Sequence, residues 1–150
     1  MEQGFAQSEK DVEASGGQMA IILDADVIIH GEKGLFDLKR WLASTDEQFE
    51  IAAITVAELW HGVERASGAH RHRREQYIQT TIESLPIVAY SEETAYEHAR
   101  IWAELSARGK MIGLYDLIVA ATALERGSKV ATFNKKHFSA VAGLKVIEPK

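Results

Sequence analysis

The sequence predicts an α/β fold: a single three-layer α/β/α domain whose central parallel sheet has four or five short strands. Short runs of apolar, often β-branched residues are typical of strands buried on both faces, and they occur at residues 20–23, 51–54, 87–90, 129–132 and 144–147. Longer segments with apolar residues at helical spacing separate these runs. Strands that alternate with helices favour a parallel sheet covered by helices on both sides, and 150 residues suffice for one such domain.

The segments between the predicted strands indicate helices near residues 24–30, 35–42, 55–63, 70–85, 91–107 and 115–125. Their ends carry the expected signals. Ser91 is a favourable N-cap, Pro86 stops the helix before it, and Gly109 and Gly127 follow the ends of two others. Residues 1–18 lack this periodicity, so we expect a flexible N-terminal extension before a domain at residues 19–150.

The composition excludes several kinds of site. The chain has no cysteine, which rules out disulfides, thiolate zinc sites and a cysteine nucleophile, and which fits a cytoplasmic protein. No run of about 18 apolar residues predicts a membrane span. The net charge of −5 is far from the basic balance of proteins that bind nucleic acid by charge alone. A nucleic-acid enzyme of this composition would therefore need a local basic patch or bound metal ions.

Acidic and polar residues occur where the predicted strands end. In parallel sheets, ligands gather beyond the carboxyl ends of the strands, so these residues are candidates for a site. The candidates are Asp24 and Asp26 after the first strand, Thr55 and Glu58 after the second, Asp116 at the start of the helix before the fourth, and Thr132, Asn134 and His137 after the fourth.

Several carboxylates at one edge of a sheet predict a site for hard divalent cations. Mg²⁺ and Mn²⁺ prefer carboxylate and water oxygens and usually keep several waters, so a few acids suffice. Carboxylates this close would repel one another without a cation, which predicts metal dependence. In phosphodiester hydrolysis, one metal ion can lower the pKa of a bound water and a second can stabilise the leaving oxygen.

Each candidate also has a structural interpretation when it is taken alone. The alternatives are an N-cap for Asp24, a T-x-x-E capping box for Thr55 and Glu58, a favourable helix-dipole position for Asp116, a turn for Thr132 and Asn134, and an ordinary surface position for His137. Their joint placement at one edge of the predicted sheet favours a functional site over these separate structural roles.

The densest basic segment lies at residues 65–74. It contains Arg65, Arg71, Arg73 and Arg74, which could contact RNA phosphates. Equally, these residues could form a solvated helix end with some Arg–Glu pairs, or could contact a protein partner.

Four blocks of sequence, in order, resemble the PIN-domain family. The first is IILDADVIIHGEKG, a strand that ends in an aspartate and is followed by a helix, and the second is IAAITVAELWHG, with its T-x-x-E-L context. GLYDLIVAATALERGSKVATFNKKHF resembles the third and fourth blocks, and the closing GLKVI also fits. The resemblance covers residues 19–150, and within the family the chain is similar to VapC-type toxins of bacterial or archaeal toxin–antitoxin pairs.

This resemblance implies a Mg²⁺- or Mn²⁺-dependent endoribonuclease that hydrolyses RNA phosphodiester bonds with a metal-activated water. It also implies a cognate antitoxin protein that binds near the active site, and it implies a homodimer. Carried over by motif, Asp24, Glu58 and Asp116 are the catalytic acids that hold the metal.

Two positions depart from the family pattern. Asn134 falls where many members have a fourth catalytic acid, and because an amide supplies no carboxylate, a second metal would be held more weakly or only with substrate. Asp26 falls where the family often has asparagine, and it would orient ligands or water, with Thr55 and Thr132 in supporting positions. Side chains alternate along an extended segment, so we expect Asp26 to point away from Asp24.

Two other functions stay open from the residues alone. The segment DADV at residues 24–27 also matches the D-x-D-x-[TV] nucleophile motif of haloacid-dehalogenase-like phosphatases, in which the first aspartate is phosphorylated. That chemistry needs a later lysine, for which Lys129 and Lys135 are candidates, and an acidic pair that does not follow the fourth strand. The other possibility is a non-catalytic interaction module with the same fold, for which Asn134 is the only hint.

Overall fold

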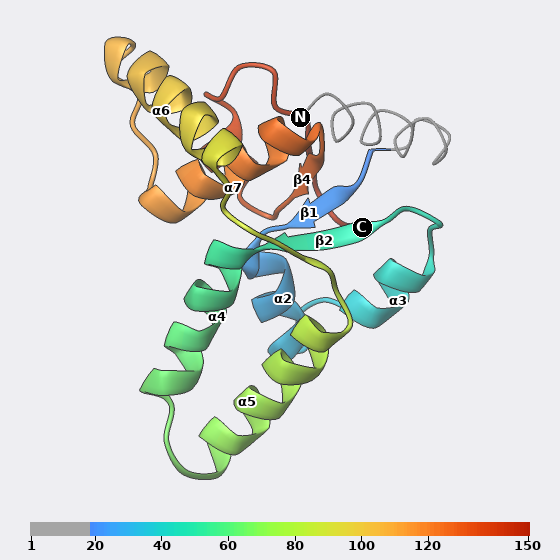
Figure 1. The fold of residues 1–150 in the computed structure, drawn as a ribbon. Coiled ribbons are helices and arrows are strands. Elements are labelled where there is room, and N and C mark those ends of the chain that lie inside the picture. The colour runs from blue at the N-terminus through green and yellow to red at the C-terminus, as the bar shows by residue number, and fades with distance from the viewer. Residues whose placement is uncertain (1–18) are drawn as a thin grey trace.

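The computed structural model describes residues 19–150, and the predicted extension at residues 1–18 lies outside this range. A sheet of five parallel strands forms the centre of the domain (Figure 1). The strands are β1 (Ile21–Leu23), β2 (Phe49–Ala52), β3 (Ile87–Val88), β4 (Lys129–Ala131) and β5 (Val146–Ile147). The parallel α/β fold predicted from the sequence is confirmed.

Seven helices connect or follow these strands in the described part of the chain. They are α2 (Ala25–Glu32), α3 (Leu38–Ala43), α4 (Ala53–Arg65), α5 (Gly68–Glu83), α6 (Glu92–Ala107), α7 (Leu114–Arg126) and α8 (Lys135–Phe138). Every predicted helix is present with shifted ends, and the short α8 has no counterpart in the prediction. No helix within residues 19–150 is long and apolar enough to cross a membrane.

The boundary between β2 and α4 differs from the prediction for a physical reason. The sequence extends the second strand through Ile54, whereas β2 ends at Ala52 and α4 begins at Ala53. Ile54 lies in the first turn of α4 and packs against the core beneath α6 and α7. A residue in a first helical turn can pack against the core as a strand residue does, so hydrophobicity alone does not mark where the strand ends.

Two layers of helices cover the two faces of the sheet (Figure 1). The layer of α2, α3, α4 and α5 packs on the face that carries Ile21 and Leu23 of β1, and the layer of α6, α7 and α8 packs on the face that carries Ile22. All three side chains are fully buried. Burial on both faces explains why β1 is a continuous apolar run rather than an alternating one.

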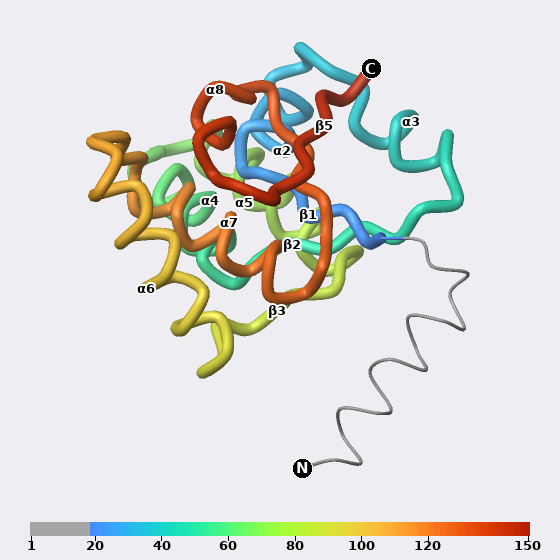
Figure 2. The backbone as a smooth tube through the Cα atoms, turned by 90° about the horizontal axis from the view of Figure 1, so that it is seen from above, coloured from blue at the N-terminus to red at the C-terminus, as the bar shows by residue number. Residues whose placement is uncertain are grey.

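The strand order β3-β2-β1-β4-β5 reverses direction between β1 and β4. Figure 2 shows β3, β2, β1 and β5 in this order across the sheet. At the reversal, the backbone N–H of Asp24 donates to the carbonyl of Ala131 at 2.9 Å and joins the ends of β1 and β4. Because the connections leave these two strands in opposite directions, the place where they end is where a parallel sheet offers a crevice to ligands.

The helices α4 and α5 form a hairpin that projects from the sheet (Figure 1). Arg74 of α5 fastens it to the body, because its Nε donates to Glu32 of α2 at 3.0 Å and its Nη1 donates to the carbonyl of Gly62 at 3.3 Å. The Arg74 and Glu32 side chains are only 22% and 11% exposed. A second pair on the hairpin, Arg71 with Glu64, is more open to solvent, at 40% and 60%.

We predict that Arg74→Ala destabilises the fold by roughly 1–3 kcal/mol, because it leaves the Glu32 carboxylate shielded from water and unpaired. The matched control is Arg71→Ala, which removes an exposed pair and should change the unfolding free energy by less than about 0.5 kcal/mol. Urea unfolding followed by tryptophan fluorescence measures both. Equal losses in the two variants would show that the Arg74 contact does not fasten the hairpin.

Candidate functional site

Asp24 lies at the point where β1 passes into α2, and its carboxylate has two fixed partners. It is the N-cap of α2, and its Oδ1 accepts from the backbone N–H of Ala25 at 2.9 Å. Its Oδ2 accepts from the hydroxyl of Thr132, the residue after β4, at 2.8 Å. The side chain is buried, with 5% exposed. The capping interpretation of Asp24 is therefore correct, and it leaves Oδ2 at the centre of the crevice between β1 and β4.

Asp26 points toward the same crevice, which corrects the expectation that it would face away from Asp24. Its Oδ2 accepts from the backbone N–H of Phe133 at 3.0 Å and from the amide of Asn134 at 3.1 Å. The hydroxyl of Thr132 lies 3.3 Å from the same oxygen. The expectation was wrong because residues two apart lie on the same face of an extended segment, and Asp24 has an extended backbone. The contacts with Phe133 and Asn134 hold the Asp26 carboxylate toward the segment after β4.

The segment that follows β4 forms the second wall of the crevice. The backbone N–H of Asn134 donates to the hydroxyl of Thr132 at 3.0 Å, so the predicted turn is present. The same turn presents the Thr132 hydroxyl to Asp24 and the Asn134 amide to Asp26. The structural and functional interpretations of these two residues are thus compatible, since the turn is what aims them at the acids.

Glu58 lies on α4, and the capping box predicted for it is absent. The helix begins at Ala53 with Ala52 as its N-cap, and no side chain caps it. Thr55 and Glu58 therefore lie one turn apart inside the helix. Thr55 is buried, and its hydroxyl has no hydrogen-bond partner within residues 19–150. Burial raises the pKa of Glu58, and the nearby charge of Asp116 raises it further.

Asp116 lies in the first turn of α7, as the helix-dipole interpretation requires, but it also has a partner across the site. Its Oδ2 lies 3.0 Å from Nδ1 of His137 on α8, and the His137 side chain is 57% exposed. Asp116 faces the other acids as well, because its charge contributes to the raised pKa of both Asp24 and Glu58. The two outer helices α4 and α7 thus bring one carboxylate each to the crevice.

The pKa values of the four carboxyl groups are all raised, which shows that they share one environment. Burial, followed by the nearby charge of Asp26, raises the pKa of Asp24 from 3.8 to about 7, and Asp116 and Glu58 add to the effect. Burial is also the main cause of the raised pKa at Asp26, Glu58 and Asp116. The contact with His137 opposes the shift at Asp116. The charges of neighbouring acids therefore raise the pKa of Asp24 and Glu58 beyond the effect of burial, which places acids from three segments of the chain near one another.

All the side chains of the crevice named above, apart from His137, offer oxygen atoms, the donors that Mg²⁺ and Mn²⁺ prefer. As the side chains stand, no three His, Asp or Glu residues of the described part of the chain are grouped tightly enough to hold an ion. A complete ligand set would therefore need side-chain rotation or bound waters. Waters are the rule for Mg²⁺, which usually takes only one or two protein carboxylates.

The PIN-domain family matches residues 21–144 of the sequence. The chain belongs to the PIN-domain family. Ribonuclease VapC1 of Rickettsia felis is 32% identical to this PIN domain over 133 residues, which cover 86% of this chain and 96% of that protein. The tRNA(fMet)-specific endonuclease VapC of Shigella flexneri is 27% identical over 134 residues, which cover 85% and 96% of the two chains.

A solved structure of DNA-bound VapBC from Salmonella typhimurium has the same fold as this PIN domain. It superposes with a TM-score of 0.78 at 26% identity and covers 87% of this chain and 98% of that one. The predicted family and fold are confirmed, and the phosphatase alternative is not favoured. Lys129, one lysine considered for that alternative, begins β4 at the end of the sheet opposite Asp24 and lies 3.4 Å from Glu47.

The basic residues predicted to contact RNA lie on the hairpin of the PIN domain, with Arg65 at the end of α4 and the other three on α5. Arg74 and Arg71 pair with Glu32 and Glu64, as the alternative interpretation proposed. Arg65 and Arg73 are exposed. Sequence reasoning overlooked a closer feature: His61 on α4 and Tyr115 on α7 face each other across ring centroids 5.9 Å apart. The signal was available, since Tyr115 precedes Asp116 and His61 follows Glu58 by one helical turn.

The raised pKa of Asp24 predicts how the stability of the metal-free PIN domain depends on pH. The folded protein holds a proton on Asp24 that the unfolded chain releases near pH 3.8, so the contribution of this group is complete below that pH and is lost as the pH rises through about 7. We predict that Asp24→Asn stabilises the metal-free protein by on the order of 1–3 kcal/mol at about pH 8 and by little near pH 4. Thermal unfolding in EDTA across this range measures it.

The control for this prediction is Asp37→Asn, which alters the exposed N-cap of α3, where Oδ1 accepts from the backbone N–H of Arg40. An asparagine can serve as an N-cap at both positions, so a difference between the two variants reports the effect of removing the charge rather than the loss of a cap. A stabilisation by Asp24→Asn that does not grow with pH would contradict the proposed electrostatic origin.

Proposed function

We propose that this PIN domain is a metal-dependent endoribonuclease and the toxin of a type II toxin–antitoxin pair. One observation carries the proposal: carboxylates from three separate segments converge at the strand reversal, where burial and the charges of the neighbouring acids raise the pKa of Asp24. Such an arrangement is unfavourable for folding alone, and it suits a site that a divalent cation neutralises. Membership in a family whose curated relatives are named VapC ribonucleases supports the reaction class.

The residues present fit Mg²⁺ or Mn²⁺ in chemical type. Asp24, Glu58 and Asp116 would hold the ion, and the buried hydroxyl of Thr55, which lacks a partner among residues 19–150, lies one turn from Glu58. When bound, the ion supplies a strong positive charge that polarises a phosphodiester and lowers the pKa of water. Carboxylates that repel one another when the site is empty gain attraction when a cation lies among them, so the fit is electrostatic as well as steric.

The chain itself holds these acids in place for the reaction. The backbone N–H of Ala25 and the hydroxyl of Thr132 fix both oxygens of Asp24. His137 lies at hydrogen-bond distance from one oxygen of Asp116 and restrains that side chain. Glu58 comes from α4 on the opposite side of the crevice and would bind metal or orient the attacking water. Groups locked by such contacts need little reorganisation when substrate binds.

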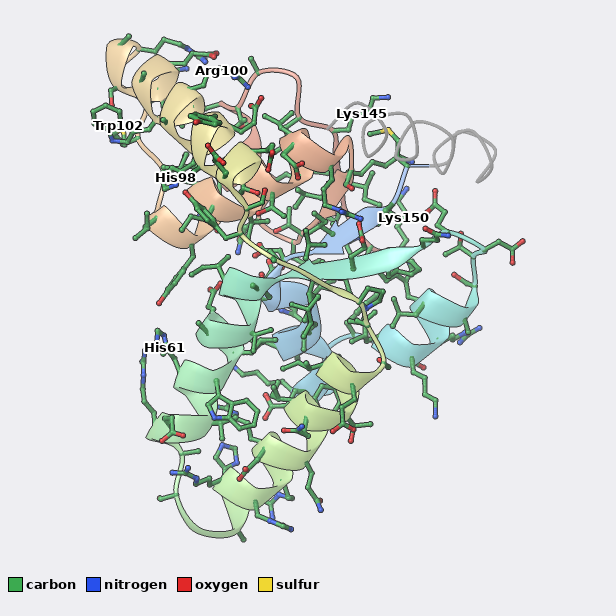
Figure 3. All side chains as sticks on the ribbon, in the orientation of Figure 1. His61, His98, Arg100, Trp102, Lys145 and Lys150 are labelled. Carbon is green, nitrogen blue, oxygen red and sulfur yellow. The ribbon has the colours of Figure 1, made fainter. Side chains whose placement is uncertain are left out.

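The partners follow from the relatives. Because the neighbouring Salmonella structure is a toxin–antitoxin complex, we propose a cognate antitoxin for this chain, and we propose RNA in the cytoplasm as the substrate. Transfer RNA is the first substrate class to test, since the Shigella relative is named for tRNA(fMet). A homodimer agrees with the large apolar side chain of Trp102 on α6, which is 53% exposed (Figure 3).

We predict that Asp24→Asn and Asp116→Asn each lower the rate of RNA cleavage by at least about a hundredfold, because losing a metal ligand removes several kcal/mol of charge stabilisation. Cleavage of labelled RNA in Mg²⁺, in Mn²⁺ and in EDTA measures the effect, and calorimetry with Mn²⁺ measures binding. Asp46→Asn, an exposed acid in the loop before β2, is the control and should cleave as the unchanged protein does.

Undiminished cleavage in both active-site variants would remove this mechanism. Absence of both Mn²⁺ binding and cleavage in the unchanged protein would favour a non-catalytic interaction module.

The contact between Asp26 and Asn134 predicts that their roles can be exchanged. The family pattern places an acid at residue 134 and often an asparagine at residue 26. In this chain the acid is at residue 26 and the asparagine at residue 134, and the two side chains are hydrogen-bonded at 3.1 Å. We predict that Asp26→Asn lowers cleavage roughly tenfold, and that the double variant Asp26→Asn with Asn134→Asp recovers most of the loss. The double variant keeps four carboxylates and the same hydrogen-bonded pair.

The single variant Asn134→Asp completes this cycle, because it places two carboxylates in contact and should bind Mn²⁺ with altered affinity. Cleavage rates of all four proteins give the coupling between the two positions. A double variant no more active than the weaker single variant would show that the fourth acid is needed specifically on α2.

A further inference from the structure

Two aromatic rings meet at the rim of the acidic crevice. The rings of His61 on α4 and Tyr115 on α7 are tilted by 59°, with centroids 5.9 Å apart. The hydroxyl of Tyr115 lies 3.4 Å from Nδ1 of His61, at the long end of hydrogen-bond distance. His61 is exposed and Tyr115 is half-buried, and Figure 3 shows His61 on the outer side of α4. A contact this long adds little to stability, so holding α4 against α7 does not account for placing the exposed His61 ring beside Tyr115.

The position of the two rings is set by the acids themselves. His61 follows Glu58 by three residues, so it lies on the same side of α4, about one turn or 5 Å further along. Tyr115 immediately precedes Asp116 in the first turn of α7. Glu58 and Asp116 therefore face each other between α4 and α7, and His61 and Tyr115 face each other next to them along the same gap. A polynucleotide whose phosphate lies at the acids must place an adjoining nucleotide near these rings.

The chemistry of the rim suits a base rather than a phosphate. Leu114, the residue before Tyr115, is 62% exposed and adds an apolar side chain beside the ring in sequence. The acids next to it would repel an unneutralised phosphate, whereas a nucleobase is neutral and has a flat apolar face. Unpaired bases in protein–RNA complexes stack on tyrosine and histidine rings.

The geometry points to a stacking platform: we infer that His61 and Tyr115 hold an unpaired RNA base next to the phosphodiester that is cut. This inference rests on the proposed ribonuclease function and adds a determinant of substrate choice to it. It predicts that the enzyme requires single-stranded RNA at the cut, because a paired base is not free to leave its neighbours. It also explains why a protein with a net charge of −5 can engage RNA without a basic surface at the site.

The test is a cycle between the protein ring and the RNA base. A short unstructured RNA with one mapped cleavage position is compared with versions that carry an abasic residue at each flanking position. For the unchanged protein, one abasic substitution should lower kcat/KM by roughly five- to a hundredfold. Tyr115→Leu should lower cleavage of the intact RNA by a similar factor and should be indifferent to that abasic position. Tyr115→Phe, which keeps the ring, should cleave as the unchanged protein does, and His61→Leu should behave as Tyr115→Leu does.

Tyr96→Leu is the matched control, because Tyr96 is an exposed tyrosine that pairs with Glu92 on α6, away from the crevice. It should respond to the abasic residue as the unchanged protein does. Independent, multiplying effects of Tyr115→Leu and the abasic residue would overturn the inference, as would a Tyr115→Phe variant as impaired as Tyr115→Leu. Thermal unfolding of each variant shows whether a loss of activity reflects a loss of folding.

Binding separates this inference from the proposed function. The affinity of Asp24→Asn for the same RNAs in Mg²⁺ is measured by fluorescence anisotropy, without any need for cleavage. The unchanged protein could cleave no RNA under any condition and yet show base-dependent binding that Tyr115→Leu abolishes. That result would support the stacking platform and contradict the nuclease function. Cleavage that ignores every flanking base would keep the nuclease and remove the platform.

Discussion

Mutual repulsion among carboxylates at the end of the sheet is the constraint on which the site depends. Burial raises the pKa of Asp24, Asp26, Glu58 and Asp116, and the charges of neighbouring acids raise the pKa of Asp24 and Glu58 further. The fold tolerates the cluster because strong local contacts leave Asp24 no other position: it caps α2, and it accepts from Thr132 after β4. The same region joins β1 to β4 at the strand reversal, so the contacts that stabilise the sheet there also assemble the site.

Two polar side chains lie beside particular acids and limit the repulsion. Asn134 donates an amide hydrogen to Asp26, where a carboxylate would add a charge within 3.1 Å. His137 faces Asp116 and opposes the rise in its pKa. Both groups come from the segment just after β4, and neither is buried. This segment therefore sets the charge of the crevice from its open side, where a bound cation or substrate could replace its contacts without disturbing the core.

The sequence predicted the elements and their order because a strand or helix that buries one or two faces has regularly spaced apolar residues, whatever the details of its packing. It failed where two structures share one pattern. The apolar run through Ile54 fits a strand and a first helical turn equally well, and the prediction for Asp26 overlooked that residues two apart share one face of an extended segment. The positions of Asp24 and Asp116 in one crevice followed from the rule for parallel sheets, whereas the contact between Asp26 and Asn134 depends on rotamers that no periodicity records. The predicted start of the domain at residue 19 stays a prediction.

The hairpin of α4 and α5 links the stability of the fold to the shape of the site. Glu58 and His61 both lie on α4, so any tilt of that helix moves one acid and one ring relative to Asp116 and Tyr115 on α7. The tilt is restrained near the middle of the hairpin, where Arg74 reaches both α2 and the carbonyl of Gly62, the residue after His61. A contact far from the chemistry in sequence thus fixes the width of the gap that an RNA strand must enter, and small changes in that width alter positioning more than they alter stability.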